Sequence, residues 1–190
     1  MIHLHTYNEG HGSSCKYCSY QKLKRAREYR QFVEHYQVII DQNISSLVDE
    51  LCTQIQDKLN NQGPVLVMHP ATRNLKDIDP YLSELIKIIE NVIDGRKLLI
   101  KNDSIGFAQK KNATLTYAEK SQKVEINKNV LDGIDINCIN SVVIIDDTFD
   151  SGESYKITIE KLKEIGIETD KIIFASILKI ESKKEPSLKI

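Results

Sequence analysis

The sequence has no long apolar run and little cysteine. No stretch approaches the roughly 18 to 20 apolar residues that a membrane-spanning helix needs. The first residues also lack the basic and then apolar layout of a signal peptide. Of the four cysteines, only Cys15 and Cys18 are close together, so a disulfide framework is not expected. These absences predict a cytoplasmic protein without a membrane span.

An excess of charge of one sign is also missing, since the formal net charge is -1. This balance argues against a nucleic-acid surface over the whole molecule. One local basic cluster is either a solvated helix face or a nucleic-acid contact, and it comprises Lys22, Lys24, Arg25, Arg27 and Arg30. Apolar residues make up 41% of the chain and charged residues 28%, as in ordinary soluble proteins. The length of 190 residues suits one domain with a small appended lobe.

Apolar periodicity predicts helices that alternate with buried strands. Helices are expected at 40–59, from Asp79 to about residue 94, and at 154–165, where Gly166 ends the last one. Short apolar runs predict strands at 65–68, 98–100, 141–145 and 172–178, and residues 102–129 form a long polar loop or a loose hairpin. The order predicts an α/β fold, with a Rossmann-like parallel sheet flanked by helices and ligands at the carboxyl ends of its strands.

The most informative stretch is VVIIDDTFDSGES, from Val142 to Ser154. A tight turn around Ser151 and Gly152, next to a helix N-terminus, can surround a phosphate with backbone N–H groups. Gly152 permits a positive φ and a close backbone approach. Ser151 and Ser154 add hydroxyl donors. The stretch is therefore predicted to bind an anion.

Two acids, Asp146 and Asp147, precede that turn. Carboxylates beside a phosphate site repel the ligand unless they have another task. Accepting hydrogen bonds from sugar hydroxyls and holding Mg2+ near a polyphosphate are two such tasks. The combination suggests a phosphorylated ribose, while the alternative is a solvated strand end.

This stretch resembles the signature with which type I phosphoribosyltransferases bind 5-phosphoribosyl-1-pyrophosphate (PRPP). The resemblance implies that Asp146 and Asp147 bind the ribose hydroxyls. It also implies a 5-phosphate site made of Asp150, Ser151, Gly152, Glu153 and Ser154. Asp150 resembles the version in 6-oxopurine phosphoribosyltransferases, where this acid is the acid/base that faces the purine. For Asp150 the alternative is a helix N-terminal acid favoured by the dipole.

The resemblance covers roughly residues 40 to 180 and implies further sites. The loop after the strand 65–68 would bind pyrophosphate through Ala71, Thr72 and Arg73, unless it is an ordinary polar loop. Segment 102–129 falls where the family carries its catalytic lid, with Lys110 or Lys111 near the leaving diphosphate, unless it is a solvated insertion. A loose likeness to the ComF-like branch rests on Lys101, Gln109, Leu115 and Lys123, where lysines replace arginines.

The implied reaction transfers the 5-phosphoribosyl group from PRPP to a nitrogen nucleophile, expected to be a nucleobase, and releases pyrophosphate with Mg2+ as cofactor. Catalytic roles then fall to Asp146, Asp147 and Asp150. Only Glu181 to Ile190 follow the last core strand, so the base would be covered by residues 1–39 or by a partner chain. Two rivals are a PRPP- or nucleotide-sensing regulator of the same fold and a nucleic-acid-associated module. A homodimer is left open.

Residues 1–39 are predicted to form an N-terminal hood ahead of a core domain at 40–190. Two cysteines separated by two residues can hold one tetrahedral metal ion, and upstream histidines could complete a zinc site. The predicted ligands are His5, His11, Cys15 and Cys18. The cysteines could otherwise be unbound thiols or a redox pair. Cys52 and Cys138 are expected to be structural.

Overall fold

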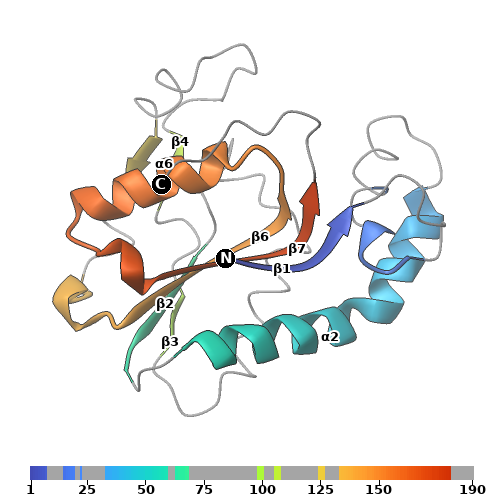
Figure 1. Ribbon diagram of the computed structural model, residues 1–190, viewed down its shortest axis with the longest axis horizontal. Helices are drawn as coiled ribbons and strands as arrows, with labels where there is room; N and C mark the ends of the chain where they lie inside the picture. Colours follow the sequence, from blue (N-terminus) through green and yellow to red (C-terminus); the bar gives the residue numbers. More distant parts are fainter. Residues whose placement is uncertain are drawn as a thin grey trace.

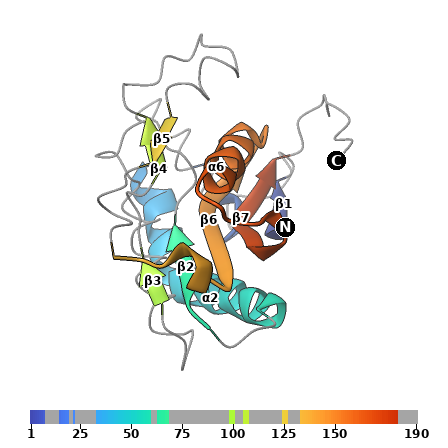
Figure 2. The ribbon, with the colours of Figure 1, turned by 90° about the vertical axis from the view of Figure 1, so that its left-hand side faces the viewer.

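The computed structural model describes residues 1–7, 15–19, 22, 33–59, 63–68, 98–100, 105–107, 124–126 and 133–180. Strands of the main sheet are β1 (Ile2–Tyr7), β2 (Val65–Met68), β3 (Leu98–Ile100), β6 (Ser141–Phe149) and β7 (Ile172–Ile180). They lie in the order β1-β7-β6-β2-β3, and every neighbouring pair is parallel. Helix α2 (Val33–Lys58) covers one face and α6 (Glu153–Glu164) the other (Figures 1 and 2). The predicted α/β fold with a parallel sheet between helices is confirmed.

The central strands are apolar on both sides because both faces of the sheet are covered. All four residues of β2 are buried. In β6 the side chains alternate, so that Val143 and Ile145 join the cluster beneath α2. Val142 and Ile144 join the cluster beneath α6. The two clusters form the core, and they hold the carboxyl end of β6 in a fixed position.

The C-terminal end of α6 matches its prediction to within one residue. Gly166 adopts a φ of 92° and its N–H donates to the carbonyl of Lys163, while the N–H of Ile167 donates to the carbonyl of Leu162. This pattern satisfies carbonyls that a helix end leaves unpaired. Ile167 and Leu162 are both buried, so the cap also closes the core.

Two elements differ from the predicted division at residue 39. Strand β1 adds to the edge of the sheet by pairing with β7, so residues 2–7 belong to the main sheet. Helix α2 begins at Val33 and crosses the predicted boundary. Ile2 and Leu4 alternate with two histidines, which is the pattern of a strand with one buried face. Because the segment is short and polar, no strand was predicted there from the sequence.

A small antiparallel pair lies within the segment predicted as a loop or loose hairpin. Strands β4 (Ile105–Phe107) and β5 (Val124–Ile126) pair with each other, and β5 lies beside α6. The helix predicted from Asp79 lies outside the described residues, as do the residues on which the ComF-like likeness rests. None of the described helices is both long and apolar enough to span a membrane.

Candidate functional site

The acidic pair lies inside strand β6 and not in a loop after it. We expected the strand to end at Ile145, but its pairing with β7 continues through Phe149, with Asp146 opposite Ser176 and Thr148 opposite Leu178. The prediction failed at this boundary because β7 is also longer than expected and supplies backbone partners to polar residues. Main-chain pairing with β7 therefore continues past the acidic pair and fixes the position of Asp146.

A tight turn follows the strand and opens α6. Gly152 is the N-cap of the helix, with φ 72° and ψ 5°, and no side chain caps it. The first helical bond runs from the N–H of Lys156 to the carbonyl of Gly152 at 2.9 Å. The N–H of Glu153 points to the hydroxyl of Ser151 at 3.4 Å. The first N–H groups of a helix have no intrahelical acceptor, so this turn presents donors to an anion.

Strand end, turn and helix start enclose a pocket of about 90 Å³. A cavity needs about 10–15 Å³ on this measure to hold a water molecule, so the space exceeds one water. Most of the predicted site residues lie together here. The pocket is lined by Asp146, Thr148, Phe149, Asp150, Ser151, Gly152, Glu153, Ser154, Tyr155 and Phe174.

Thr148 contributes an unsatisfied hydroxyl to this pocket. Among the described residues, its Oγ1 is the buried side-chain polar atom that has no hydrogen-bond partner. A buried hydroxyl without a partner costs about 1–3 kcal/mol, and such groups call for an explanation. This hydroxyl is shielded from the pocket space, so a ligand could reach it only if the surrounding side chains move.

Aromatic rings form the wall of the pocket beneath α6. The ring of Phe149 lies 5.3 Å from that of Phe174 and 5.0 Å from that of His3, between centroids. Tyr155 packs on Phe174 at 4.8 Å. Burial raises the pKa of Tyr155. His3 lies behind Phe149 and does not line the pocket; burial, then Lys179 and the N-terminal amine, lower its pKa.

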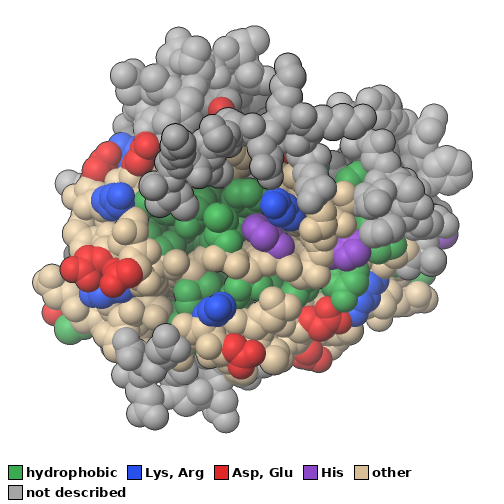
Figure 3. Space-filling view, viewed as in Figure 1, with side chains coloured by type: hydrophobic (Ala, Val, Ile, Leu, Met, Phe, Trp, Pro, Cys, Tyr) green, Lys and Arg blue, Asp and Glu red, His purple; other side chains and the backbone are tan. Residues whose placement is uncertain are grey.

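The pocket carries acids and no described basic residue. Asp146, Asp150 and Glu153 all line it, and no lysine or arginine is among its described lining residues. On the face seen in Figure 1, apolar side chains lie near the centre, with a histidine and a lysine or arginine side chain beside them (Figure 3). An anion here would depend on backbone N–H groups and on an added cation.

Several predicted residues lie outside the described part of the chain. They are the pyrophosphate-loop residues Ala71, Thr72 and Arg73, the lid residues Lys110 and Lys111, and the fourth metal ligand, His11. Strand β2 ends at Met68, opposite Ile144. In the sheet register, β2 therefore ends two residues before the level of Asp146. For Asp147 only the main chain is described.

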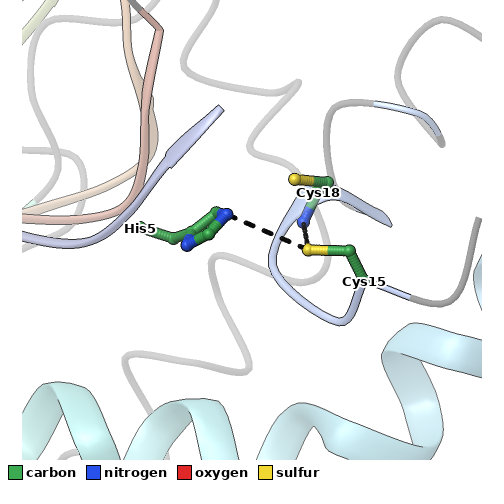
Figure 4. A group of neighbouring side chains, drawn as sticks. All are labelled: His5, Cys15 and Cys18. Carbon is green, nitrogen blue, oxygen red and sulfur yellow. Dashed lines mark hydrogen bonds between the residues drawn. The ribbon is translucent and has the colours of Figure 1, made fainter. Parts of the chain in front are cut away.

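A second group of polar residues gathers at the neighbouring edge of the sheet. His5 from β1 meets Cys15 and Cys18, and their ligand atoms all lie within 4.8 Å of one another (Figure 4). The Nε2 of His5 is 4.0 Å from the Sγ of Cys15. The backbone N–H of Cys18 donates to the same sulfur at 3.4 Å. Three of the four predicted zinc ligands are thus brought together.

The residues between the two cysteines hold this group against α2. Lys16 forms an ion pair with Glu50, and the hydroxyl of Tyr17 donates to the same carboxylate at 2.6 Å. Burial raises the pKa of Glu50, but the hydrogen bonds from Lys16 and Tyr17 outweigh it and leave the pKa lowered. Two contacts to Glu50 therefore tie the cysteine turn to α2.

Sequence reasoning gave no role to Thr148, Tyr155 and Phe174, which also line the pocket. Thr148 occupies a variable position of the signature, so the motif gave no reason to select it. Phe174 comes from another strand, and nothing local links it to the turn. The other two cysteines lie apart from the metal-ligand group. Cys52 is buried on α2, where burial raises its pKa to about 11, and Cys138 is exposed.

Comparison with known proteins gives only distant likenesses. No model of a known protein family matches the chain, and no curated protein matches it. Two solved structures of a hypoxanthine phosphoribosyltransferase from Staphylococcus aureus are similar, with 22% and 19% identity and a TM-score of 0.41 each. The matches cover 73% and 76% of this chain and 62% and 69% of theirs. The function therefore has to be inferred from the residues of the site.

Proposed function

We propose that the pocket at the start of α6 binds the 5-phosphate of PRPP, and that the protein transfers the phosphoribosyl group to a nitrogen of a nucleobase. The carrying observation is the coincidence of two features in one pocket. These are a helix N-terminus without a side-chain cap and the acid Asp146 at the pocket rim. The first suits the phosphate of a phosphorylated ribose, and the second suits its hydroxyls.

The phosphate part is assigned to the turn. Backbone N–H groups of residues 152–154, with the hydroxyls of Ser151 and Ser154, surround a tetrahedral anion. The αL conformation of Gly152 allows the backbone to approach the phosphate closely. The pocket volume of about 90 Å³ suits a phosphate group, while the remainder of PRPP would lie outside it.

The acids are assigned to the ribose hydroxyls and to Mg2+. Asp146 lies in a strand, so its position is fixed before the ligand arrives. Mg2+ is usually held by one or two carboxylates and by substrate phosphates, which fits the acids at this rim. When bound, the ion neutralises charge on the diphosphate. Since no described lysine or arginine lines the pocket, PRPP binding should depend strongly on Mg2+.

In the proposed reaction a nitrogen of the base attacks C1 of the ribose. The C1–N bond forms, the bond from C1 to the pyrophosphate oxygen breaks, and the electron pair leaves with pyrophosphate. Asp150 takes the proton that the nitrogen loses. Its side chain is exposed at the pocket rim, where an incoming base can reach it. Alignment of the two substrates supplies most of the acceleration.

The test has two stages. Calorimetric titration of PRPP with and without Mg2+ measures binding, and pyrophosphate release in the presence of a panel of purine and pyrimidine bases measures transfer. Binding with base-dependent pyrophosphate release supports the proposal. Binding without release for any base would instead support a PRPP-sensing regulator. If PRPP does not bind at millimolar concentration, both the transferase and the regulator proposals are wrong.

A further inference from the structure

We infer that His5, Cys15 and Cys18 bind one Zn2+ ion, which fastens residues 15–19 to the edge strand of the sheet. Zinc favours thiolate sulfur and imidazole nitrogen, and the three donor atoms converge from two separate segments (Figure 4). Nothing in the proposed PRPP site requires this ion. The two sites can therefore fail independently of each other.

The spacing of the donor atoms suits a tetrahedral ion. With zinc–sulfur bonds of about 2.3 Å and zinc–nitrogen bonds of about 2.0 Å, tetrahedral donors lie about 3.5–3.8 Å apart. The separation of the His5 Nε2 and the Cys15 Sγ is 4.0 Å, and all pairs lie within 4.8 Å. Closing these gaps requires only small side-chain rotations.

The surroundings keep the donors in place before metal arrives. The ring of Tyr17 stacks on that of His5, with centroids 4.8 Å apart and planes at 17°, so the imidazole has a defined plane. Tyr17 is in turn held by Glu50 of α2. Cys18 is fully buried, and its backbone N–H donates to the Cys15 sulfur, as expected for a thiolate ligand. Outer contacts of this kind orient metal ligands and tune their basicity.

The cluster lies beside the proposed PRPP pocket. His5 is opposite Leu178 of β7, which is opposite Thr148 of β6. One register row therefore runs from the cluster to the pocket across three strands, a backbone distance of about 10 Å at about 4.8 Å per strand. A metal at His5 would fix residues 15–19 near the pocket, although none of them lines it.

The direct test uses the full-length protein, purified without added chelator. Metal analysis should find about one zinc per chain, and X-ray absorption should show two sulfur neighbours at about 2.3 Å. Replacement by Co2+ should give the strong visible bands of a tetrahedral thiolate site. These measurements need no variant, so they stand even if a variant fails to fold. A metal-free protein that gives no such cobalt spectrum would overturn the inference.

Variants then identify the ligands. Cys15→Ser, Cys18→Ser and His5→Ala should each lower zinc affinity at least tenfold and weaken or shift the cobalt bands. Matched controls are Cys138→Ser and His35→Ala, which change an exposed cysteine and an exposed histidine outside the cluster. These two variants should leave the zinc affinity and the cobalt bands unchanged. An intact cobalt spectrum in Cys15→Ser and Cys18→Ser would show that the metal lies elsewhere. A Cys15–Cys18 disulfide in the freshly isolated protein would favour a redox pair and contradict the inference.

Discussion

The turn at the start of α6 and the cluster around His5 are built in different ways. Nearly all of the pocket comes from consecutive residues, from Asp146 to Tyr155, with Phe174 as the one described lining residue from elsewhere. The cluster joins a strand at the N-terminus with a later turn and depends on a contact with α2. A site made of consecutive residues can be found from a motif. A site assembled from separate segments needs the fold to bring its members together.

The largest expected effect concerns the acidic pair. Asp146→Ala combined with Asp147→Ala removes two charge-assisted contacts, each of which contributes about 1.5–3 kcal/mol. Calorimetry should show PRPP affinity lower by roughly 100-fold to 10,000-fold. Glu168→Ala with Asp170→Ala changes the net charge equally at the start of β7, on exposed residues, and should leave affinity unaltered. Equal affinity in the two double variants would refute the assignment of the acids to the ribose.

Zinc should have the next largest effect, which is on the stability of the folded chain. A ligand that binds only the folded chain at 100 times its Kd stabilises it by about 2.7 kcal/mol. For a chain of this size that raises Tm by about 5 to 10 °C. Calorimetric melting before and after chelation measures the difference. The Cys15→Ser variant should show a clearly smaller difference, because weaker zinc binding stabilises the folded chain less. A wild-type Tm that does not change on chelation would contradict zinc binding at this site.

Gly152 and Gly166 both have a positive φ, but only Gly152 lies in the proposed phosphate site. Substituting each in turn distinguishes the effect of backbone strain from the loss of a ligand contact. Gly152→Ala and Gly166→Ala should each lower the free energy of unfolding by about 1–2 kcal/mol, because an L-residue is strained there. Around Gly166 a Cβ would meet no atom within 4 Å, but at Gly152 it would lie 3.0 Å from the Phe149 ring. Only Gly152→Ala should therefore also weaken PRPP binding. If both variants bind PRPP equally well, the turn does not cradle the phosphate.

The smallest expected effect is that of Thr148→Val, and its sign is informative. Removing an unsatisfied hydroxyl from a buried site should leave the free energy of unfolding unchanged or raise it slightly. PRPP affinity should stay unchanged, because this hydroxyl is shielded from the pocket space. Urea denaturation and calorimetry on the same sample measure the two quantities. A fall in PRPP affinity of about fivefold or more in Thr148→Val would show that the ligand does reach this hydroxyl.

Prediction from the sequence succeeded where the pattern was strong and local. Apolar runs located β2 and β3, and Gly166 marked the end of α6. It failed for β1, whose polar face resembles a loop, and for the length of β6, whose acidic end is a strand because β7 pairs with it. His5 and the cysteine pair were predicted as metal ligands, and the fold brings these three together.

The sequence by itself determined the alternation of helices and buried strands, and the small, acidic and hydroxyl-bearing residues of the turn at Gly152. Such features arise from contacts between near neighbours, which the order of residues already specifies. Only the tertiary structure decided that β1 joins the sheet, that Thr148 has a buried and unpaired hydroxyl, and that His5 meets two cysteines. These depend on pairing and packing between distant segments, whose register is fixed by the burial of a whole sheet face.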